Sequence, residues 1–412
     1  MSILFTNIHQ LVGVRSADAP AMTASEMRNV QVIHNAYLYC EEGEIMDYGR
    51  MEDMELHHPS EVVDCTDRCI MPGYVDSHTH LVHAASRESE FVMRADGKSY
   101  QEIAAAGGGI LNSVEKLRNM SRQELYDQAA VHLDRAIRSG TTSIEIKTGY
   151  GLDLENELKM LDVIHELKRE FDLDVKSTLL AAHAVPREFT GDADGYLKYV
   201  LEKILPAAAE KAVDYVDIFV EQNYFTVQHL KDLLKAAKQS SLGAKVHVNQ
   251  FTALGGVAAA VDHGALSVDH LEVLTDRDVA ALQSGTTIPV GLPACSFFLN
   301  LEYTPVRRLL DAGVPVALAT DFNPGSSPTS NMNFVGSLGV TQMKLTVNEA
   351  FNACTIMGAA ALGMQDAVGS ITEGKKANLI LTEPLKQWEA LFYHFTENKI
   401  AAVYLGGKLY GA

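Results

Sequence analysis

The 412-residue chain has little positive charge and little cysteine. Its 34 Lys and Arg residues are outnumbered by 53 Asp and Glu residues, which gives a formal net charge of −19. This balance argues against nucleic acid, whose binding rewards clustered cations, and against anionic membrane surfaces. The five cysteines are scattered and odd in number. A disulfide framework is therefore not expected, and reduced thiols in a cytoplasm fit better.

The chain also lacks the apolar segments that target or anchor proteins in membranes. No apolar run approaches the ~18 residues that are needed to span a bilayer. Residues 1–7 contain no cationic segment followed by an apolar block, so no secretory signal is expected. The absences together favour a cytoplasmic protein that acts on a small molecule, without nucleic-acid or membrane partners.

From about residue 70 onward the chain alternates apolar, strand-like segments with amphipathic, helix-like ones. Such βα repeats are typical of a parallel sheet. Eight segments have the composition of buried strands: 69–76, 141–147, 175–181, 213–220, 244–248, 266–269, 286–290 and 314–319. Eight strand–helix units are the count of a closed (β/α)8 barrel. An open, doubly wound sheet would carry a glycine-rich phosphate turn after its first strand, and no such fingerprint follows residue 76.

Both ends of the chain have a different, β-rich texture. Short strands and turns fill the first 65 residues, and strand-like patterns return at 368–381 and 400–408. The simplest arrangement is one small β-sandwich domain built from both termini, residues 1–65 and 366–412, beside a barrel of residues 66–365. The predicted fold class is therefore α/β, a TIM-type barrel with a composite accessory domain.

The strongest local signal is the segment 71–80, in which an apolar strand leads through Pro72 and Gly73 to His78 and His80. Side chains two residues apart on a strand share one face. Two imidazoles held side by side are half of a tetrahedral zinc or iron site. Because many His-x-His pairs are solvated surface residues, the other strand ends must decide what this pair means.

Potential ligands recur at the ends of other predicted strands, where (β/α)8 barrels carry their chemistry. They lie at or just after the third, fifth, sixth and eighth strands: His183, His247, His270 and Asp321. With the His pair of the first strand, His247 and Asp321 supply three imidazoles and one carboxylate, which suit one zinc or iron ion. A metal held there lowers the pKa of a bound water toward ~7. Because imidazoles titrate near neutrality, His270 is the best-placed proton shuttle.

The pattern Pro-Gly-x-x-Asp-x-His-x-His resembles the marker of the amidohydrolase superfamily. Four further segments resemble signature segments of the imidazolonepropionase family, in the family's order: 87–91, 147–152, 181–186 and 320–326. The similarity covers nearly the whole chain. It implies a metal-dependent hydrolase of a cyclic amide, which opens 4-imidazolone-5-propanoate to N-formimidoyl-L-glutamate in the third step of histidine degradation. It also implies a homodimer.

The resemblance further implies roles for individual residues. Arg87 would grip the propionate of the substrate bidentately, and Tyr150 would add a hydroxyl donor. His183 matches the family residue that contacts the imidazolone ring. Three residues match the loop that presents donors to the ligand: Asn323, Gly325 and Ser326.

One position departs from the family pattern. Well-known members read His-x-Asp-Glu-Phe after the third metal histidine, and their glutamate is proposed to handle protons. Here residues 247–251 read His-Val-Asn-Gln-Phe. The amide of Gln250 can hydrogen-bond a water or a ring nitrogen, but it cannot take up a proton. We therefore expect Gln250 to orient, and His270 and Asp321 to transfer protons.

Two other functions stay open on the sequence. Another mononuclear amidohydrolase, such as a cyclic-amidine or aminopurine deaminase, would share the metal ligands, although an anion clamp of Arg87 and Tyr150 is useless for an uncharged purine. A barrel that survives only as a binding protein would be expected to lose ligands first, and all four are present. Glu221 stands where binuclear members place a bridging lysine, which favours one metal over two.

Overall fold

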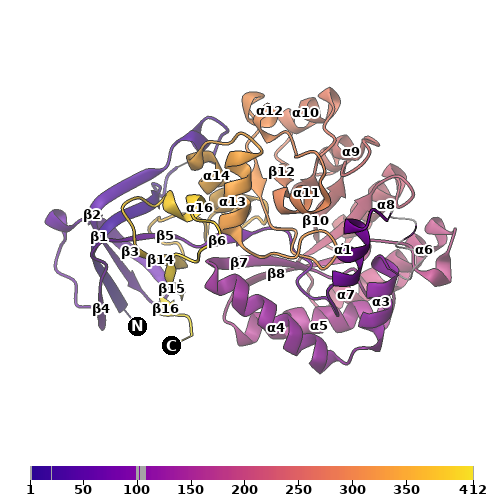
Figure 1. The fold of residues 1–412 in the computed structure, drawn as a ribbon, viewed down its shortest axis with the longest axis horizontal. Helices are drawn as coiled ribbons and strands as arrows, with labels where there is room; N and C mark the ends of the chain where they lie inside the picture. The colour runs from indigo at the N-terminus through magenta and orange to yellow at the C-terminus, as the bar shows by residue number, and fades with distance from the viewer. Residues whose placement is uncertain (1, 20, 99–101, 103–107, 412) are drawn as a thin grey trace.

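The computed structural model describes every residue except 1, 20, 99–101, 103–107 and 412, and it contains two eight-stranded sheets. In Figure 1 the indigo and yellow strands of the two chain ends lie together, beside the magenta-to-orange barrel. The terminal sheet comprises β1 (Ser2–Val14), β2 (Gln31–Glu41), β3 (Glu44–Arg50), β4 (Glu61–Asp64), β5 (Arg68–Pro72), β14 (Leu379–Pro384), β15 (Ile400–Leu405) and β16 (Lys408–Leu409). The expected small β domain from both termini is thus confirmed.

The terminal sheet encloses an apolar cluster of its own. Its order is β16-β15-β14-β5-β1-β2-β3, with β4 paired to β1. Buried side chains from both chain ends form the cluster, among them Phe5, Leu38, Ile70, Leu379 and Tyr404. Backbone hydrogen bonds from Ile45 to Lys375 and from Ala377 to Gly43 join the β2–β3 turn to the segment before β14. Neither chain end therefore makes this domain alone.

The second sheet is the barrel. Its strands are β6 (Tyr74–Asp76), β7 (Thr141–Lys147), β8 (Asp174–Ala182), β9 (Tyr215–Val220), β10 (Gly243–Val248), β11 (Ser267–His270), β12 (Ile288–Gly291) and β13 (Ala317–Leu318). They pair in chain order and in parallel. Backbone hydrogen bonds from His80 to Phe322 and from Asp321 to His78 link the last strand to the first. The predicted barrel of eight parallel strands is confirmed.

The first predicted barrel strand, 69–76, proves to be two strands. Its first half, β5, pairs with β1 and β14 in the terminal sheet, whereas its second half, β6, pairs with β7 in the barrel. Gly73 lies between them, and a Cβ atom there would stand 2.2 Å from two side-chain atoms of Thr142. No side chain fits at such a separation. We propose that the division between the two units falls at Gly73 and not at residue 65.

Helices follow the barrel strands, apart from the last helix, which lies between β14 and β15 of the terminal sheet. They are α1 (Glu88–Ala95), α3 (Ile110–Asn119), α4 (Arg122–Arg138), α5 (Leu154–Glu170), α6 (Ala193–Tyr199), α7 (Leu205–Glu210), α8 (Val227–Gln239), α9 (Gly256–Asp262), α10 (Asp276–Gln283), α11 (Pro293–Leu299), α12 (Val306–Asp311), α13 (Met332–Thr341), α14 (Val347–Cys354), α15 (Ile356–Ala360) and α16 (Ala390–Tyr393). Shorter helical turns span Glu26–Arg28, Met51–Asp53, Arg187–Phe189 and Val200–Ile204. Capping boxes define the starts of α4, α8, α10 and α14. Among the described residues, no helix combines the length and the apolar character that a membrane crossing requires.

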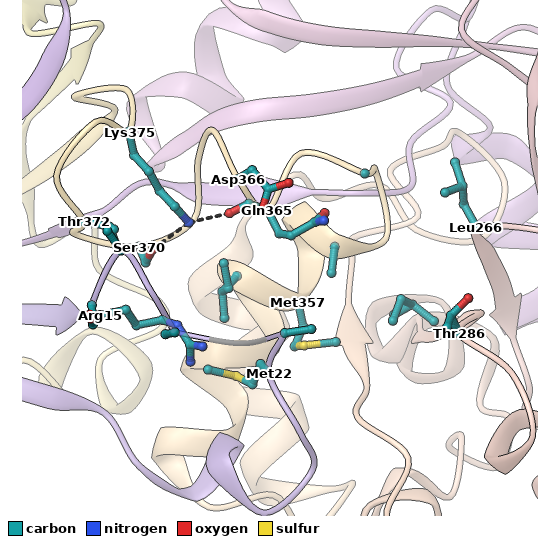
Figure 2. Close-up of a pocket in the computed structure, with 18 of the residues that line it drawn as sticks. Arg15, Met22, Leu266, Thr286, Met357, Gln365, Asp366, Ser370, Thr372 and Lys375 are labelled. Atoms are coloured by element: carbon teal, nitrogen blue, oxygen red, sulfur yellow. Dashed lines mark hydrogen bonds between the residues drawn. The ribbon is translucent and has the colours of Figure 1, made fainter.

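A cavity of about 550 Å³ lies at the amino-terminal end of the barrel, beside the residues that lead into β11 and β12 (Figure 2). Lys375 lines it and donates to the carbonyl oxygens of Gln365 and Val368 and to Ser370 Oγ. Burial, together with the nearby charge of Arg15, lowers the pKa of Lys375 to about 8. Because an ammonium has three N–H donors, these three bonds commit Lys375 to holding the turn.

Candidate active site

The carboxyl ends of the barrel strands bring the predicted site residues around one cavity of about 390 Å³. His80 follows β6, His247 belongs to β10 and Asp321 follows β13; all three line this cavity. The other predicted residues in its lining are Arg87, Tyr150, His183, Gln250, His270, Asn323, Gly325 and Ser326. His78 is fully buried, and its Nε2 lies 3.5 Å from Asp321. Strand ends remote in sequence thus converge on one place.

Side-chain atoms of four residues meet at one point of this cavity. His247 Nε2 lies 3.3 Å from His80 Nε2, and Asp321 Oδ1 lies 3.5 Å from the Nε2 atoms of both His78 and His80. Ligand atoms that share a tetrahedral zinc, with bonds of about 2.0–2.1 Å, stand about 3.3–3.4 Å apart. His78 Nε2 is buried and has no hydrogen-bond partner among the described residues. The donor set, its spacing and this unpartnered nitrogen all fit a divalent metal.

Buried carboxylates orient two of the imidazoles. His78 Nδ1 lies 2.6 Å from Asp269 Oδ2, and His247 Nδ1 lies 2.8 Å from Asp217 Oδ2. A ring that donates from Nδ1 carries its proton there and keeps the Nε2 lone pair for a metal. Asp217 and Asp269 were not predicted from the sequence. Their only signal is an acidic residue inside an otherwise apolar strand.

Two fully buried lysines lie against these carboxylates. Lys147 Nζ is 2.7 Å from Glu145 Oε1 and 2.9 Å from Asp217 Oδ2, and Lys245 Nζ is 3.6 Å from Asp269 Oδ2. Burial alone would favour a neutral lysine, but Asp217 and Glu145 outweigh it and raise the pKa of Lys147. The lysines therefore compensate buried charge that would otherwise be costly.

Burial decides the protonation of the imidazoles. It is the main cause that lowers the pKa of His78 and His80 well below the ordinary value, and it lowers the pKa of His183 to about 3. Neutral imidazole is the form that binds a metal. Burial also raises the pKa of Asp321 to about 6, and a cation beside this carboxylate would favour its ionised form.

His270 differs from the other histidines in its backbone and in its charge. Its φ is +86°, a conformation that is rare for a residue with a side chain and is concentrated at functional sites. Its Nδ1 lies 3.4 Å from Glu272 Oε1. Burial opposes a charge on this ring, but Glu272 and Asp321 outweigh burial and raise the pKa of His270. His270 is thus the imidazole of this cavity that most readily carries a proton.

Arginines provide positive charge in the cavity lining. Arg87 precedes α1, and its Nε donates to Ser113 Oγ at 2.9 Å. A Cβ atom on Gly325 would stand 2.6 Å from Arg87 Nη1, so the glycine leaves room for the guanidinium. Arg94, seven residues after Arg87, also lines the cavity and donates to Gly325 O at 2.8 Å. Arg94 was not predicted, although a spacing of seven puts both arginines on one side of a helix.

The loop after β13 is organised by Asn323. Its Oδ1 accepts hydrogen bonds from the backbone N–H groups of Gly325 and Ser326, both at 2.8 Å. Its Nδ2 donates to Asp321 O and to Ser326 Oγ, both at 2.7 Å. Several donors expected to serve a ligand are therefore engaged within the loop. Ligand binding by Asn323, Gly325 and Ser326 stays a prediction.

Two further predicted residues lie against the candidate metal ligand His80. The ring of His183 stacks on that of His80 at 5.1 Å, and His183 Nδ1 lies 3.1 Å from the carbonyl of Gly149. Donation from Nδ1 to that carbonyl makes His183 Nε2 an acceptor. The Tyr150 ring lies 6.0 Å from the His80 ring, and burial raises the pKa of Tyr150. Tyr150 is therefore a neutral hydroxyl at physiological pH.

The loop that carries Gln250 is tethered by Glu221. The Glu221 carboxylate accepts hydrogen bonds from the backbone N–H groups of Phe251 and Thr252 at 2.9 and 3.1 Å. Gln250 Nε2 lies 3.6 Å from Cys295 Sγ. Glu221 therefore has a structural task in this protein, and the number of metal ions stays a prediction.

Comparisons with known proteins identify the family and the fold of this chain. The model of the amidohydrolase family matches residues 69–410. The chain is 48% identical over 410 residues to the imidazolonepropionase of Christiangramia forsetii and 44% identical to that of Flavobacterium johnsoniae, with 99% of this chain and 100% of each relative covered. Escherichia coli guanine deaminase superposes with a TM-score of 0.76 at 15% identity, over 99% of this chain and 98% of that one. An adenosine deaminase from Xanthomonas campestris with bound zinc gives 0.69 at 18% identity, over 99% and 92%. At such identities the two superpositions show the fold alone.

Proposed function

The chain belongs to the imidazolonepropionase family of the amidohydrolases, and on that premise we propose how its cavity performs the reaction of the family. The reaction is hydrolysis of the ring amide of 4-imidazolone-5-propanoate to N-formimidoyl-L-glutamate. One observation carries the proposal. A cluster of three imidazoles and a carboxylate, which suits a metal, shares one cavity of about 390 Å³ with the guanidinium of Arg87, which suits a carboxylate of the substrate.

We propose that one divalent ion, zinc or iron, is held by His78, His80, His247 and Asp321. When bound, the ion supplies a Lewis acid that polarises the ring carbonyl and lowers the pKa of water. The carboxylates of Asp217 and Asp269 keep two of the imidazoles in the tautomer that such an ion requires. Three imidazoles and one carboxylate suit both metals.

Arg87 and its neighbours select the substrate. A protein with a net charge of −19 repels an anion, so the propionate needs a local cation. Arg87 supplies it as a planar pair of donors, and the neutral hydroxyl of Tyr150 adds another donor. His183 Nε2 accepts from the N–H of the ring. A neutral purine has no use for the arginine, which favours the imidazolone over the deaminase alternative.

Protons move through Asp321 and His270 in this proposal. Asp321 accepts a proton from the water that attacks the ring carbonyl, and this proton passes through His270 Nε2 to the ring nitrogen as the C–N bond breaks. While it carries the proton, His270 Nε2 donates a hydrogen bond to the oxyanion that develops on the carbonyl oxygen. Gln250 orients the water or the ring nitrogen, since its amide cannot accept a proton.

We also propose that the protein acts in the cytoplasm as a homodimer. All five cysteines are free and buried, as expected, which supports a reducing compartment. The homodimer rests on the family resemblance. Light scattering on the eluting protein measures the mass of the assembly, and a mass of one chain would overturn the dimer.

The proposed function is tested by following the loss of imidazolonepropionate absorbance with the purified protein, with metal content measured in parallel by mass spectrometry. We expect turnover with about one equivalent of metal per chain. Metal without turnover would overturn the reaction. Full turnover after complete removal of the metal would overturn the assignment of the metal centre.

The role of Arg87 is tested by Arg87→Gln. Hydrogen bonds to a charged group contribute about 1.5–3 kcal/mol, so we expect KM to rise by about 10–100-fold. Because the arginine binds the propionate and not the reacting bond, kcat should change much less. A substrate analogue without the carboxylate provides the control, and both proteins should bind it equally poorly. An unchanged KM in the variant would contradict the anion clamp.

A further inference from the structure

We infer that Glu272 is a positioning residue for the proposed reaction: it acts through His270 and supplies, from the loop after β11, the carboxylate that position 250 lacks. The inference rests on the proposed function. It goes beyond it by assigning a task to a residue that neither the metal site nor the substrate clamp uses.

Glu272 is a buried carboxylate beside a cavity-lining imidazole. Its Oε1 lies 3.4 Å from His270 Nδ1 and accepts a hydrogen bond from Ser296 Oγ at 3.4 Å. Its side chain is only 3% exposed. Its Oε2 is buried and has no hydrogen-bond partner among the described residues. A buried carboxylate oxygen left without a donor is costly, so its retention calls for a functional reason.

A hydrogen bond and an unusual backbone conformation fix the backbone of His270. Thr304 Oγ1 donates to the carbonyl of His270 at 2.5 Å. His270 and Leu271 both have positive φ, +86° and +65°. This turn brings Glu272 back toward the ring that lies two residues before it. The fixed backbone therefore determines which carboxylate faces His270 Nδ1.

A carboxylate at Nδ1 does two things for an imidazole. It holds the proton on Nδ1, so that Nε2 is the nitrogen left for the reaction, and it stabilises the imidazolium when a second proton is carried. The separation of 3.4 Å is long for a hydrogen bond, but such contacts commonly shorten when substrate binds. A glutamine at position 272 would keep the shape and the acceptor while removing the charge.

Positions 250 and 272 approach the same place from two neighbouring loops. Gln250 Nε2 contacts Cys295 Sγ at 3.6 Å. Ligating atoms of Cys295, His270 and Glu272 all lie within 4.8 Å of one another. Cys295 thus lies close to both the amide of Gln250 and the carboxylate of Glu272. A negative charge placed on either loop would act on the same part of the cavity.

The test uses Glu272→Gln, Gln250→Glu and the double variant, assayed with imidazolonepropionate after the wild type has shown turnover. We expect Glu272→Gln to lower kcat by about 100-fold, within the range for general acid–base groups, and to leave KM within about threefold. Its metal content should equal that of the wild type. The double variant should recover to within about tenfold of the wild-type kcat, because the charge returns from the other loop.

Glu349→Gln is the matched control. The Glu349 side chain is also fully buried, but it binds Arg28 and Arg307 at the start of α14, away from the cavity. The kcat of Glu349→Gln should equal that of the wild type. Wild-type kcat in Glu272→Gln would overturn the inference. A loss that Gln250→Glu does not repair would also overturn it, since a merely structural role predicts that result. Failure of the proposed function is seen separately, as absence of turnover in the wild type.

Discussion

The barrel has a cavity at each of its ends, about 390 Å³ at the carboxyl ends of the strands and about 550 Å³ at the amino ends. At the carboxyl ends, His78 Nε2 is buried and makes no hydrogen bond within the described part of the chain, and its ring is fixed by Asp269. At the amino ends, Lys375 has used its three donors on its own turn. In the larger cavity, the buried ammonium of Lys375 therefore has a structural role. The feature that distinguishes the candidate active site is therefore a buried polar atom that lacks a hydrogen bond and is held in place, and not the volume of its cavity.

The two cavities also differ in the charged side chains that lie beneath them. Under the carboxyl-end cavity, lysines contact carboxylates and carboxylates contact imidazoles, so Lys147 reaches His247 through Asp217. In the amino-end cavity, by contrast, Lys375 is bonded to neutral oxygens. Layers of alternating charge keep each ring at a fixed angle and compensate most of the charge that is buried there.

The largest effect is expected from removing a metal ligand. His247→Asn should lower the metal content below about one tenth of an equivalent. Activity should fall by at least about 10³-fold, more than loss of one oxyanion donor typically costs. Mass spectrometry and the absorbance assay measure the two quantities. If the variant keeps its metal, His247 is not a ligand and the carboxyl-end cavity is not the metal site.

An intermediate effect is expected from the carboxylate behind a ligand. Asp269→Asn keeps the shape but weakens the orientation of His78, and such partners typically change metal affinity by about 10–100-fold. Competition with a chelator measures the affinity. Asp366→Asn, in the lining of the amino-end cavity, is the control and should leave metal affinity unchanged. Equal affinities in all three proteins would contradict the proposed role of Asp269.

The smallest effect on activity is expected from Lys375→Met, which should leave kcat within about twofold of the wild type. Its effect is on stability and depends on pH. The pKa of Lys375 is lowered to about 8 from its ordinary 10.5, so the folded protein loses the proton first. Burying the charge costs stability below pH 8, and this cost is relieved as the pH rises from 8 to 10.5. The Tm of the wild type should therefore rise relative to that of the variant across this range. A difference in Tm between the two proteins that stays constant from pH 8 to 10.5 would contradict this pH dependence.

Much of the fold, and the convergence of most residues of the candidate metal site, were predictable because their signals are local. A spacing of two puts His78 and His80 on one face of a strand end, and barrel topology brings His247 and Asp321 to the same end. Asp269 was missed because its partner is set by tertiary packing: it pairs in register with His247, yet its side chain binds His78. Glu272 was missed because a glutamate after a strand is ordinarily solvated.

The division of the strand at Gly73 was missed for a related reason. An apolar run of eight residues does not reveal that its two halves pair with different sheets. The decisive contact is the one between Gly73 and Thr142, which lie far apart in the sequence. Packing between remote segments overrides what a short apolar run indicates about its partners.

That shared segment has a consequence for engineering the enzyme. Since β5 and β6 are joined by a single glycine, only four residues lie between Gly73 and His78. A barrel transplanted without its terminal sheet would lose the anchor of the strand that presents His78, the first proposed metal ligand. A successful graft has to bring β1, β5 and β14 along with the barrel. Circular permutants of this protein should accordingly be opened in the loops between outer helices and never between residues 68 and 80.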